Sequence, residues 1–246
     1  MAIKAGEDTF YQAKRGVVQD GLAFSVDTSL RETRSATTIR SIGGNRNVSI
    51  LNGPEFHNSR GGAYQLDGTD DYFNIVENGS VPVTNFPISI SCWFKTTNSG
   101  TLTDMVYMQT SKPASGGTYI MLYRGSSSKF VYEVRGSGGS ASVFDSSVNV
   151  VDGDWHNCVA VSSSSNNHKL YIDGNLINSN TTDVGSIATH VTSVIGCSYD
   201  YAFARNRVLL RSFFNGDISR VSIYNKALTA AEVLQNYNAT RHRFGV

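Results

Sequence analysis

The stretch FFNGDISRVSIYNKALTAAEVLQNY, from Phe213 to Tyr237, carries a turn, a strand and a helix in consecutive order. Asn215 and Gly216 form a turn signal, and the β-branched and aromatic residues typical of a strand follow: Ile218, Val221, Ile223 and Tyr224. The apolar positions change parity between Ile218 and Val221, which predicts a bulge or a strand covered on both faces. Both alternatives place this strand at the centre of a sheet.

A short helix is predicted to follow this strand and to begin near Ala230. Thr229 and Glu232 have the spacing of a capping box, in which each side chain accepts a hydrogen bond from the other residue's free backbone N–H. Leu228 and Val233 have the spacing of the hydrophobic staple that accompanies such a box.

The rest of the chain is a series of short strand patterns separated by turns rich in Gly and Ser. These patterns cover residues 22–26, 48–50, 63–67, 72–76, 88–95, 105–109, 119–123, 130–135, 155–162, 169–172 and 191–195. Asp173 and Gly174 fit a two-residue hairpin turn. Many short strands with a single helix at the end predict an all-β fold, an antiparallel two-sheet sandwich of jelly-roll type with one short C-terminal helix.

The chain is long enough to form one domain with a substantial core. It has 246 residues, of which 40% are hydrophobic, and all-β sandwiches of this length are commonly single domains. We expect residues 1–246 to form that domain. Residues 1–20 would be an N-terminal arm, residues 21–225 the β-sandwich, and residues 226–246 the short helix and C-terminal tail.

The charge pattern argues against nucleic acid and membrane as partners. The net charge is +1 and only 17% of residues are charged, so no overall field attracts polyanions or anionic lipids. No segment is apolar over a length that could span a bilayer. The first residues, MAIKAGEDTFYQAKRG, contain no apolar run of the signal-peptide kind, so we expect synthesis in the cytoplasm.

The three cysteines predict neither a disulfide framework nor a zinc site. Cys92, Cys158 and Cys197 are an odd number and lack C-x-x-C spacing. Because Cys92 and Cys158 lie within apolar strand patterns, we expect both to be small buried hydrophobic residues.

Three motifs, in this order along the chain, resemble a laminin-G-like domain of the concanavalin A-like lectin/glucanase superfamily. The family pattern F-D-G-x-D-D-Y-V corresponds to Asp67–Tyr72, and W-H-x-x-A-V followed by L-Y-I-D-G corresponds to Trp155–Val161 and Leu170–Gly174. The pattern G-x-I-D-x-V-x-I-Y-N followed by A-L-[ST]-x-x-E begins at Gly216 and reaches Glu232. The resemblance implies the two-sheet sandwich, but this fold carries binding, catalytic and structural proteins.

Two further features resemble members of this group found in bacteriophage particles. They are D-G-L-x-x-x-x-D at Asp20–Asp27 and N-G-P-x-F at Asn52–Phe56. The resemblance implies a non-enzymatic structural or decoration protein of a virion, associated with capsid, neck or tail and with other virion proteins as partners. The alternative is a carbohydrate-binding adhesion module that recognises a cell-surface glycan.

Calcium is the one metal that the resemblance brings into question. In related glucanases the Asp of the G-x-I-D pattern often helps to hold a structural calcium ion, and Ser219 stands at that position here. Asp67, Asp70 and Asp71 could supply carboxylate ligands. Alternatively, Asp67 shapes its turn while the other two are solvated or cap backbone groups. We favour the second interpretation and expect no metal and no other cofactor.

The sequence predicts no catalytic activity. Glycoside hydrolysis requires two facing carboxyl groups, which related glucanases supply from one strand as E-x-D-x-x-E or a close variant, and no such run occurs. The Arg, Gln-x-His and Tyr motifs of lyases with this fold are also missing. Glu133 is a lone carboxylate on its strand. His156 has no acidic or nucleophilic partner at a recognisable spacing, so a packed histidine is expected there.

A possible ligand site lies in a predicted loop that is rich in aromatic residues and arginine. It contains Tyr199, Tyr201, Phe203, Arg205 and Arg207, which could stack on a ligand and donate hydrogen bonds. The alternative is that the 12 Tyr and 12 Phe of the chain mainly fill a large β core.

Both ends of the chain are predicted to be contact arms of a homo-oligomer or lattice. Residues 1–20 and the tail from Asn238 to Val246 contain too few apolar residues to form cores of their own. Ordering each residue costs about 1–2 kcal/mol of backbone entropy, which a neighbouring subunit could offset. The alternative is that both ends fold back over their own sandwich.

Overall fold

The computed structural model describes residues 16–31, 34–42, 46–58, 62–75, 83, 85–100, 103–109, 118–125, 128–187, 192–202 and 207–246. Within these ranges, positions 104, 107, 109, 192, 199–202 and 207–209 are described by their backbone only.

Strands dominate the described part of the chain. They are β1 (Leu22–Asp27), β2 (Thr38–Arg40), β3 (Asn47–Leu51), β4 (Glu55–His57), β5 (Ala63–Asp67), β6 (Tyr72–Asn74), β7 (Ile88–Lys95), β8 (Thr103–Gln109), β9 (Tyr119–Arg124), β10 (Lys129–Arg135), β11 (Ala141–Asn149), β12 (Trp155–Ser164), β13 (Asn167–Ile172), β14 (Asn175–Asn180), β15 (Thr192–Ile195), β16 (Ser198–Ala202), β17 (Arg207–Arg211) and β18 (Asn215–Tyr224). The helix α2 (Ala230–Thr240) and the 3₁₀ turn η4 (Arg241–Arg243) follow.

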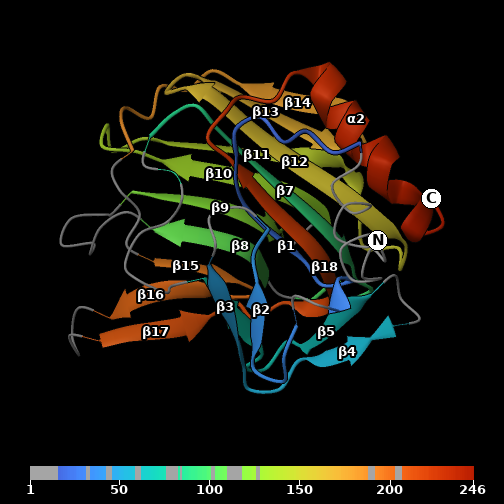
Figure 1. Ribbon diagram of the computed structural model, residues 1–246. Helices are drawn as coiled ribbons and strands as arrows, with labels where there is room; N and C mark the ends of the chain where they lie inside the picture. The colour runs from blue at the N-terminus through green and yellow to red at the C-terminus, as the bar shows by residue number, and fades with distance from the viewer. Residues whose placement is uncertain are drawn as a thin grey trace.

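The strands form two sheets that pack face to face (Figure 1). Sheet A has eight strands in the order β14-β13-β12-β7-β18-β5-β4, with β1 also paired to β18. Sheet B has eight strands in the order β11-β10-β9-β8-β15-β6-β3-β2, and β16 and β17 form a separate hairpin. Neighbouring strands run antiparallel, for example β7 with β12 and β9 with β10. The predicted antiparallel sandwich with a C-terminal helix is confirmed.

Strand β18 occupies the centre of sheet A. One edge pairs with β7, while the other pairs with β5 through its first half and with β1 through its second half. The register shifts between Ile218 and Arg220, which is the irregularity that the change of parity predicted. All residues from Asp217 to Tyr224 are buried, so the strand is covered on both faces as well.

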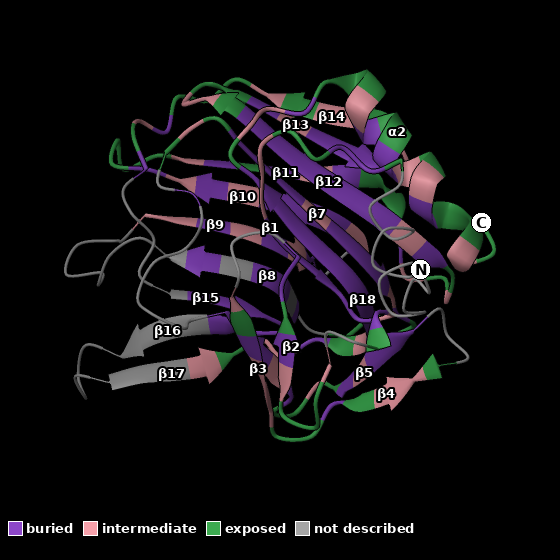
Figure 2. Cartoon of the chain, viewed as in Figure 1, coloured by how far each residue is buried: buried purple, intermediate pink, exposed green. Residues whose placement is uncertain are grey.

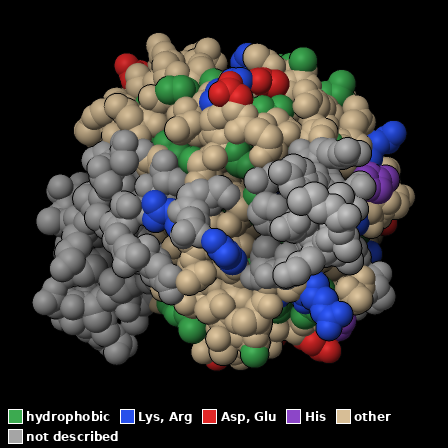
Figure 3. Space-filling view, in the orientation of Figure 1, with side chains coloured by type: hydrophobic (Ala, Val, Ile, Leu, Met, Phe, Trp, Pro, Cys, Tyr) green, Lys and Arg blue, Asp and Glu red, His purple; other side chains and the backbone are tan. Residues whose placement is uncertain are grey.

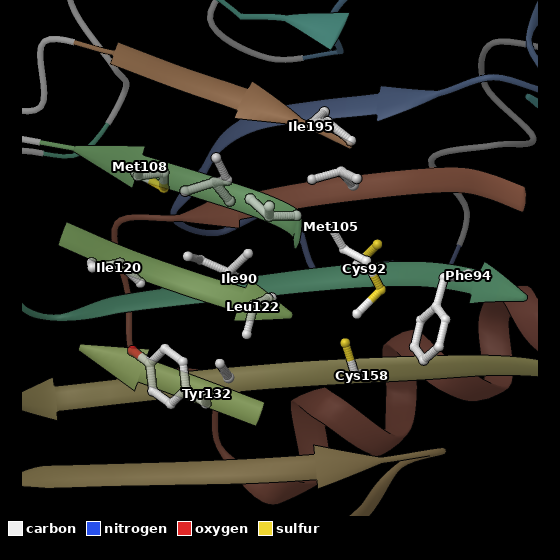
Figure 4. Close-up of a cluster of buried hydrophobic side chains, with 14 of the residues drawn as sticks. Ile90, Cys92, Phe94, Met105, Met108, Ile120, Leu122, Tyr132, Cys158 and Ile195 are labelled. Carbon is white, nitrogen blue, oxygen red and sulfur yellow. The ribbon is translucent and has the colours of Figure 1, made fainter. Parts of the chain in front are cut away.

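The core fills the space between the two sheets. Figure 4 shows Ile90, Cys92 and Phe94 of β7 among side chains such as Met105 and Leu122 of sheet B. Cys92 and Cys158 are paired across β7 and β12, are free thiols and are fully buried. Burial raises the pKa of both thiols well above the ordinary value. They are unreactive core residues, as predicted.

Helix α2 packs on the outer face of sheet A (Figures 1 and 2). Its capping box is present, because the Glu232 backbone N–H donates to Thr229 Oγ1 over 3.2 Å and the Thr229 backbone N–H donates to Glu232 Oε2 over 2.9 Å. Leu228 and Val233 are buried together in one cluster against this face of the sheet. None of the helices that the structure describes is long and apolar enough to cross a membrane.

The C-terminal tail also packs on its own sandwich. The Phe244 ring stacks on Trp93 with 4.3 Å between centroids and lies 4.6 Å from Trp155. Trp93 Nε1 donates to Thr240 Oγ1 over 3.0 Å. The tail therefore folds back rather than extending as a free arm, which was the alternative considered above. Residues 1–15 of the N-terminal arm lie outside the described residues.

A buried ion pair fastens this tail to the first strand of the sandwich. Asp27 is 1% exposed, and Arg243 Nη1 donates to its Oδ1 and Oδ2 over 2.8 and 3.0 Å. Arg220 approaches Asp27 Oδ2 to 3.5 Å, and Arg243 Nη2 donates to Ser219 Oγ over 2.7 Å. Burial alone raises the pKa of Asp27, but the two guanidinium groups outweigh it and hold that pKa below its ordinary value. The resulting stabilisation is present above the unfolded pKa of about 3.9 and is lost as the pH falls through the folded pKa.

We predict that Arg243→Met lowers the free energy of unfolding by about 3–5 kcal/mol, because it leaves the Asp27 carboxylate buried beside the more distant Arg220. The matched control is Arg241→Met, in the same turn, because Arg241 only lies over the Tyr237 ring at 5.7 Å and its loss should cost about 0.5–1 kcal/mol. Urea denaturation at neutral pH measures both. Equal effects of the two substitutions would contradict a specific role for the ion pair.

Candidate functional site

The outer face of sheet B is partly exposed where β9 and β10 lie side by side. Side chains along both strands alternate between the buried core and this outer face. Five of the outward residues are half-buried, namely Tyr119, Met121, Tyr123, Glu133 and Arg135, while Val131 on the same face is buried. We refer to these five residues as the Glu133 face.

Two tyrosines of β9 hold the Glu133 carboxylate. The Tyr119 hydroxyl donates to Glu133 Oε1 over 2.6 Å, and the Tyr123 hydroxyl donates to Oε2 over 3.1 Å. Met121 is directly opposite Glu133 in the register, so Tyr119 and Tyr123 are the two diagonal neighbours of Glu133 on β9. Glu133 remains the one carboxylate of β10, as the sequence indicated, but its two tyrosine partners were not predicted. The spacing of Tyr119 and Tyr123 puts both on one face of a strand, but only the register with β10 shows what they bind.

The Tyr119 hydroxyl stays protonated at ordinary pH. Burial raises the pKa of Tyr119 to about 12, and the hydrogen bond and charge of Glu133 add to this effect, while Arg135 beside the hydroxyl opposes it. Tyr119 therefore remains a hydrogen-bond donor to Glu133 across the neutral range.

The hairpin β16–β17 adjoins the Glu133 face. Tyr119 and Met121 pack in one apolar cluster with Val194 and Cys197, and Leu210 and Phe213 at the end of the hairpin belong to the same cluster. Of the residues predicted as a ligand site, Tyr199, Tyr201 and Arg207 lie on the two strands of this hairpin, where only their backbone is described. The predicted loop is thus largely a hairpin. Phe203 and Arg205 lie outside the described residues.

His156 is not a lone packed histidine. Its Nδ1 lies 2.8 Å from Asp173 Oδ2 and its Nε2 lies 3.1 Å from Asp152 Oδ1. Because ionised carboxylates only accept, both ring nitrogens carry protons in this arrangement. Burial lowers the pKa of His156, but the two carboxylates outweigh it and raise the pKa above its ordinary value. The ring is packed, as predicted. Its acidic partners were not predicted, and Asp173 in particular comes from the next hairpin.

The acidic turn uses its carboxylates for its own backbone. Asp67 Oδ1 accepts the backbone N–H groups of Thr69 and Asp70 over 2.7 and 3.3 Å, and Asp71 Oδ2 accepts that of Asp67 over 3.0 Å. The three carboxylates lie within 4.8 Å of one another. This geometry is that of the turn-shaping and capping alternative considered above.

The surroundings of Ser219, which stands at the Asp position of the family pattern, do not suit a bound calcium ion. Ser219 Oγ donates to the carbonyl of Gly62 over 2.9 Å and accepts from Arg243. The guanidinium groups of Arg243 and Arg220 already balance the nearby Asp27 carboxylate. A cation there would face two positive charges and one negative charge.

We predict that a chelator leaves the melting temperature unchanged, since only a ligand that binds the folded state raises that temperature. Differential scanning calorimetry with and without EDTA, followed by added calcium, measures the effect. A drop of several degrees that calcium reverses would show that other oxygens hold an ion.

A family model described as the Concanavalin A-like lectin/glucanases superfamily, of the laminin-G type, matches residues 67–234. The chain belongs to this superfamily. The match covers the acidic turn and most of sheets A and B, including the Glu133 face. No curated protein matches the sequence.

Solved structures with the same fold include binding domains of clostridial neurotoxins. The binding domain of botulinum neurotoxin DC in complex with SialylT has a TM-score of 0.66 and 14% identity, over 90% of this chain and 52% of that one. The ligand binding domain of botulinum neurotoxin serotype D in complex with N-acetylneuraminic acid gives 0.64 and 16%, over 92% and 52%. Trypanosoma rangeli sialidase in complex with the inhibitor DANA gives 0.64 and 11%, over 90% and 33%.

These similarities concern the fold alone, because the identities are low. The chain spans about half the length of the two neurotoxin domains and a third of the sialidase. Belonging to this superfamily therefore gives the architecture, while the chemistry has to come from residues such as those of the Glu133 face.

Proposed function

We propose that this protein is a non-catalytic, lectin-like module that binds a glycan on the Glu133 face. The observation that carries the proposal is the Glu133 carboxylate, held by the hydroxyl groups of Tyr119 and Tyr123 on a partly exposed sheet surface. The hairpin β16–β17, with Tyr199 and Tyr201, borders that surface.

The residue types of the Glu133 face suit sugar recognition. A carboxylate accepts hydrogen bonds through several lone pairs, of which the two tyrosines use one on each oxygen, so sugar hydroxyls can donate to the others. Tyrosine rings and Met121 provide apolar surface for the C–H faces of a sugar ring. A few convergent polar groups on a surface with aromatic residues are typical of small-molecule sites.

The neighbouring carboxylate argues for binding rather than hydrolysis. A glycosidase needs one carboxyl group as a proton donor and a second as base or nucleophile. Asp145 of β11 lies near Glu133 in the register, but it is 3.5 Å from Lys129 and accepts the backbone N–H of Ser147 over 2.8 Å. Both carboxylates are thus engaged by neighbouring groups of the sheet.

The similar structures support the proposal in a general way. Two of them are described as binding domains in complex with SialylT or N-acetylneuraminic acid. On the face that Figure 3 shows, the charged side chains of the described residues lie in small, separate groups among uncharged surface.

We predict that Tyr119→Phe combined with Tyr123→Phe weakens glycan binding at least tenfold, because the Glu133 carboxylate loses both hydrogen bonds that orient it. Each bond contributes about 1 kcal/mol, and about 1.4 kcal/mol corresponds to tenfold in affinity. A glycan array identifies the ligand and titration calorimetry measures the affinity.

The matched control for this face is Glu55→Gln, which removes an exposed carboxylate on β4 of sheet A. It should leave the affinity unchanged. Binding that survives the double Tyr→Phe substitution but disappears on replacing residues of the β16–β17 hairpin would move the site to the hairpin.

A second candidate is the virion decoration protein implied by the phage-like motifs. In the structure these motifs have architectural roles: Asp27 anchors Arg243, Asn52 Nδ2 donates to the carbonyl of Asp70 over 2.8 Å, and Phe56 packs edge-on against Tyr64. The virion candidate therefore rests on the resemblance of these motifs alone, and both functions are compatible on one chain.

For this candidate we expect the chain to copurify with phage particles, as one partner among other virion proteins. Mass spectrometry of gradient-purified particles is the measurement, with host cytoplasmic proteins as the contamination control. Absence of the chain from particles whose genome encodes it would contradict the virion role and leave the glycan-binding proposal standing.

A further inference from the structure

We propose that the Glu133 face selects neutral sugars and rejects acidic ones such as sialic acids and sulfated sugars. The inference rests on the proposed function and names the ligand class of that site. It follows from the direction of the hydrogen bonds and the balance of charge around Glu133.

The hydrogen bonds leave Glu133 as an acceptor toward a ligand. The protons of the Tyr119 and Tyr123 hydroxyls point at the carboxylate, so these protons are not donors to a ligand bound above them. Because the pKa of Tyr119 is about 12, this direction does not reverse by loss of the proton at neutral pH. A ligand must therefore bring donors, which neutral sugars have in their hydroxyl groups.

The described charges on these three strands are equal in number. Among the outward side chains that the structure describes on β9, β10 and β11, the cations Lys129 and Arg135 are matched in number by the carboxylates Glu133 and Asp145. Lys129 Nζ lies 3.5 Å from Asp145 Oδ2, and Arg135 lies beside the Tyr119 hydroxyl that binds Glu133. The carboxylate of an acidic sugar would meet the Glu133 carboxylate, and the described charges of these three strands leave no surplus positive charge to offset the repulsion.

One of the similar structures holds an acidic sugar, whereas we propose that the Glu133 face rejects acidic sugars. The serotype D domain is described in complex with N-acetylneuraminic acid, yet this chain covers only 52% of it at 16% identity. The acidic sugar of that structure therefore gives no ground to expect an acidic sugar on the Glu133 face.

The test compares one neutral glycan with its acidic counterpart. N-acetyllactosamine and its sialylated form, or another neutral and sialylated pair taken from the array, are titrated into the full chain by calorimetry. We expect the neutral form to bind at least tenfold more tightly than the sialylated form. The difference should shrink as ionic strength rises, because salt screens the repulsion at this partly exposed site.

The informative substitution is Glu133→Gln, which keeps the size of the side chain and one acceptor oxygen but removes the charge. It should reduce the preference for the neutral form to about threefold or less, with Glu55→Gln as the control that leaves the preference unchanged. A melting curve for each variant establishes that it is folded.

Two results would overturn the inference, and they are distinguishable. If the wild-type chain binds the sialylated form as tightly as the neutral form, or if Glu133→Gln leaves the preference intact, charge selection at Glu133 is wrong while glycan binding stands. If no glycan of either class binds to the folded protein, the proposed function fails and this inference fails with it.

Discussion

The architecture depends on one constraint, which is that every edge and both faces of β18 must be covered. Two different strands complete its second edge, β5 along one half and β1 along the other, and the bulge between Ile218 and Arg220 falls where the two halves meet. A buried strand cannot leave backbone groups unpaired, so the first strand of the chain has to return to the last one. Asp27, at the end of β1, then lies within reach of Arg243.

Local patterns predicted many elements of this fold, because their causes lie within a few residues, but they missed strands such as β11 and β14. The Thr229 and Glu232 box begins α2 at Ala230, and the change of parity in β18 marks a true register shift. The strand pattern of residues 88–95 likewise identified β7. These signals depend on the backbone of one segment and need no knowledge of its neighbours.

The candidate site was harder to predict because its partners come from different strands. Glu133 is two residues from Arg135 in sequence, yet its donors lie on β9, and only the β9–β10 register places Met121 opposite it. His156 shows the same limit, since Asp173 reaches it from the β13–β14 turn. A sequence shows which face a side chain occupies, whereas hydrogen-bond partners depend on strand order and register.

The two sheets consequently divide the tasks of the molecule. Helix α2 and the C-terminal tail cover the outer face of sheet A. Phe244 of the tail packs on Trp93 and Trp155, so these large aromatic side chains stabilise the fold. On sheet B several outer residues of β9 and β10 are only half-buried, and two tyrosine hydroxyls hold the Glu133 carboxylate without an additional helix. A carboxylate held in this way is rigid, and a rigid acceptor loses little entropy when a ligand binds. For this reason we propose the Glu133 face as the site of recognition, while the aromatic cluster of sheet A serves the fold.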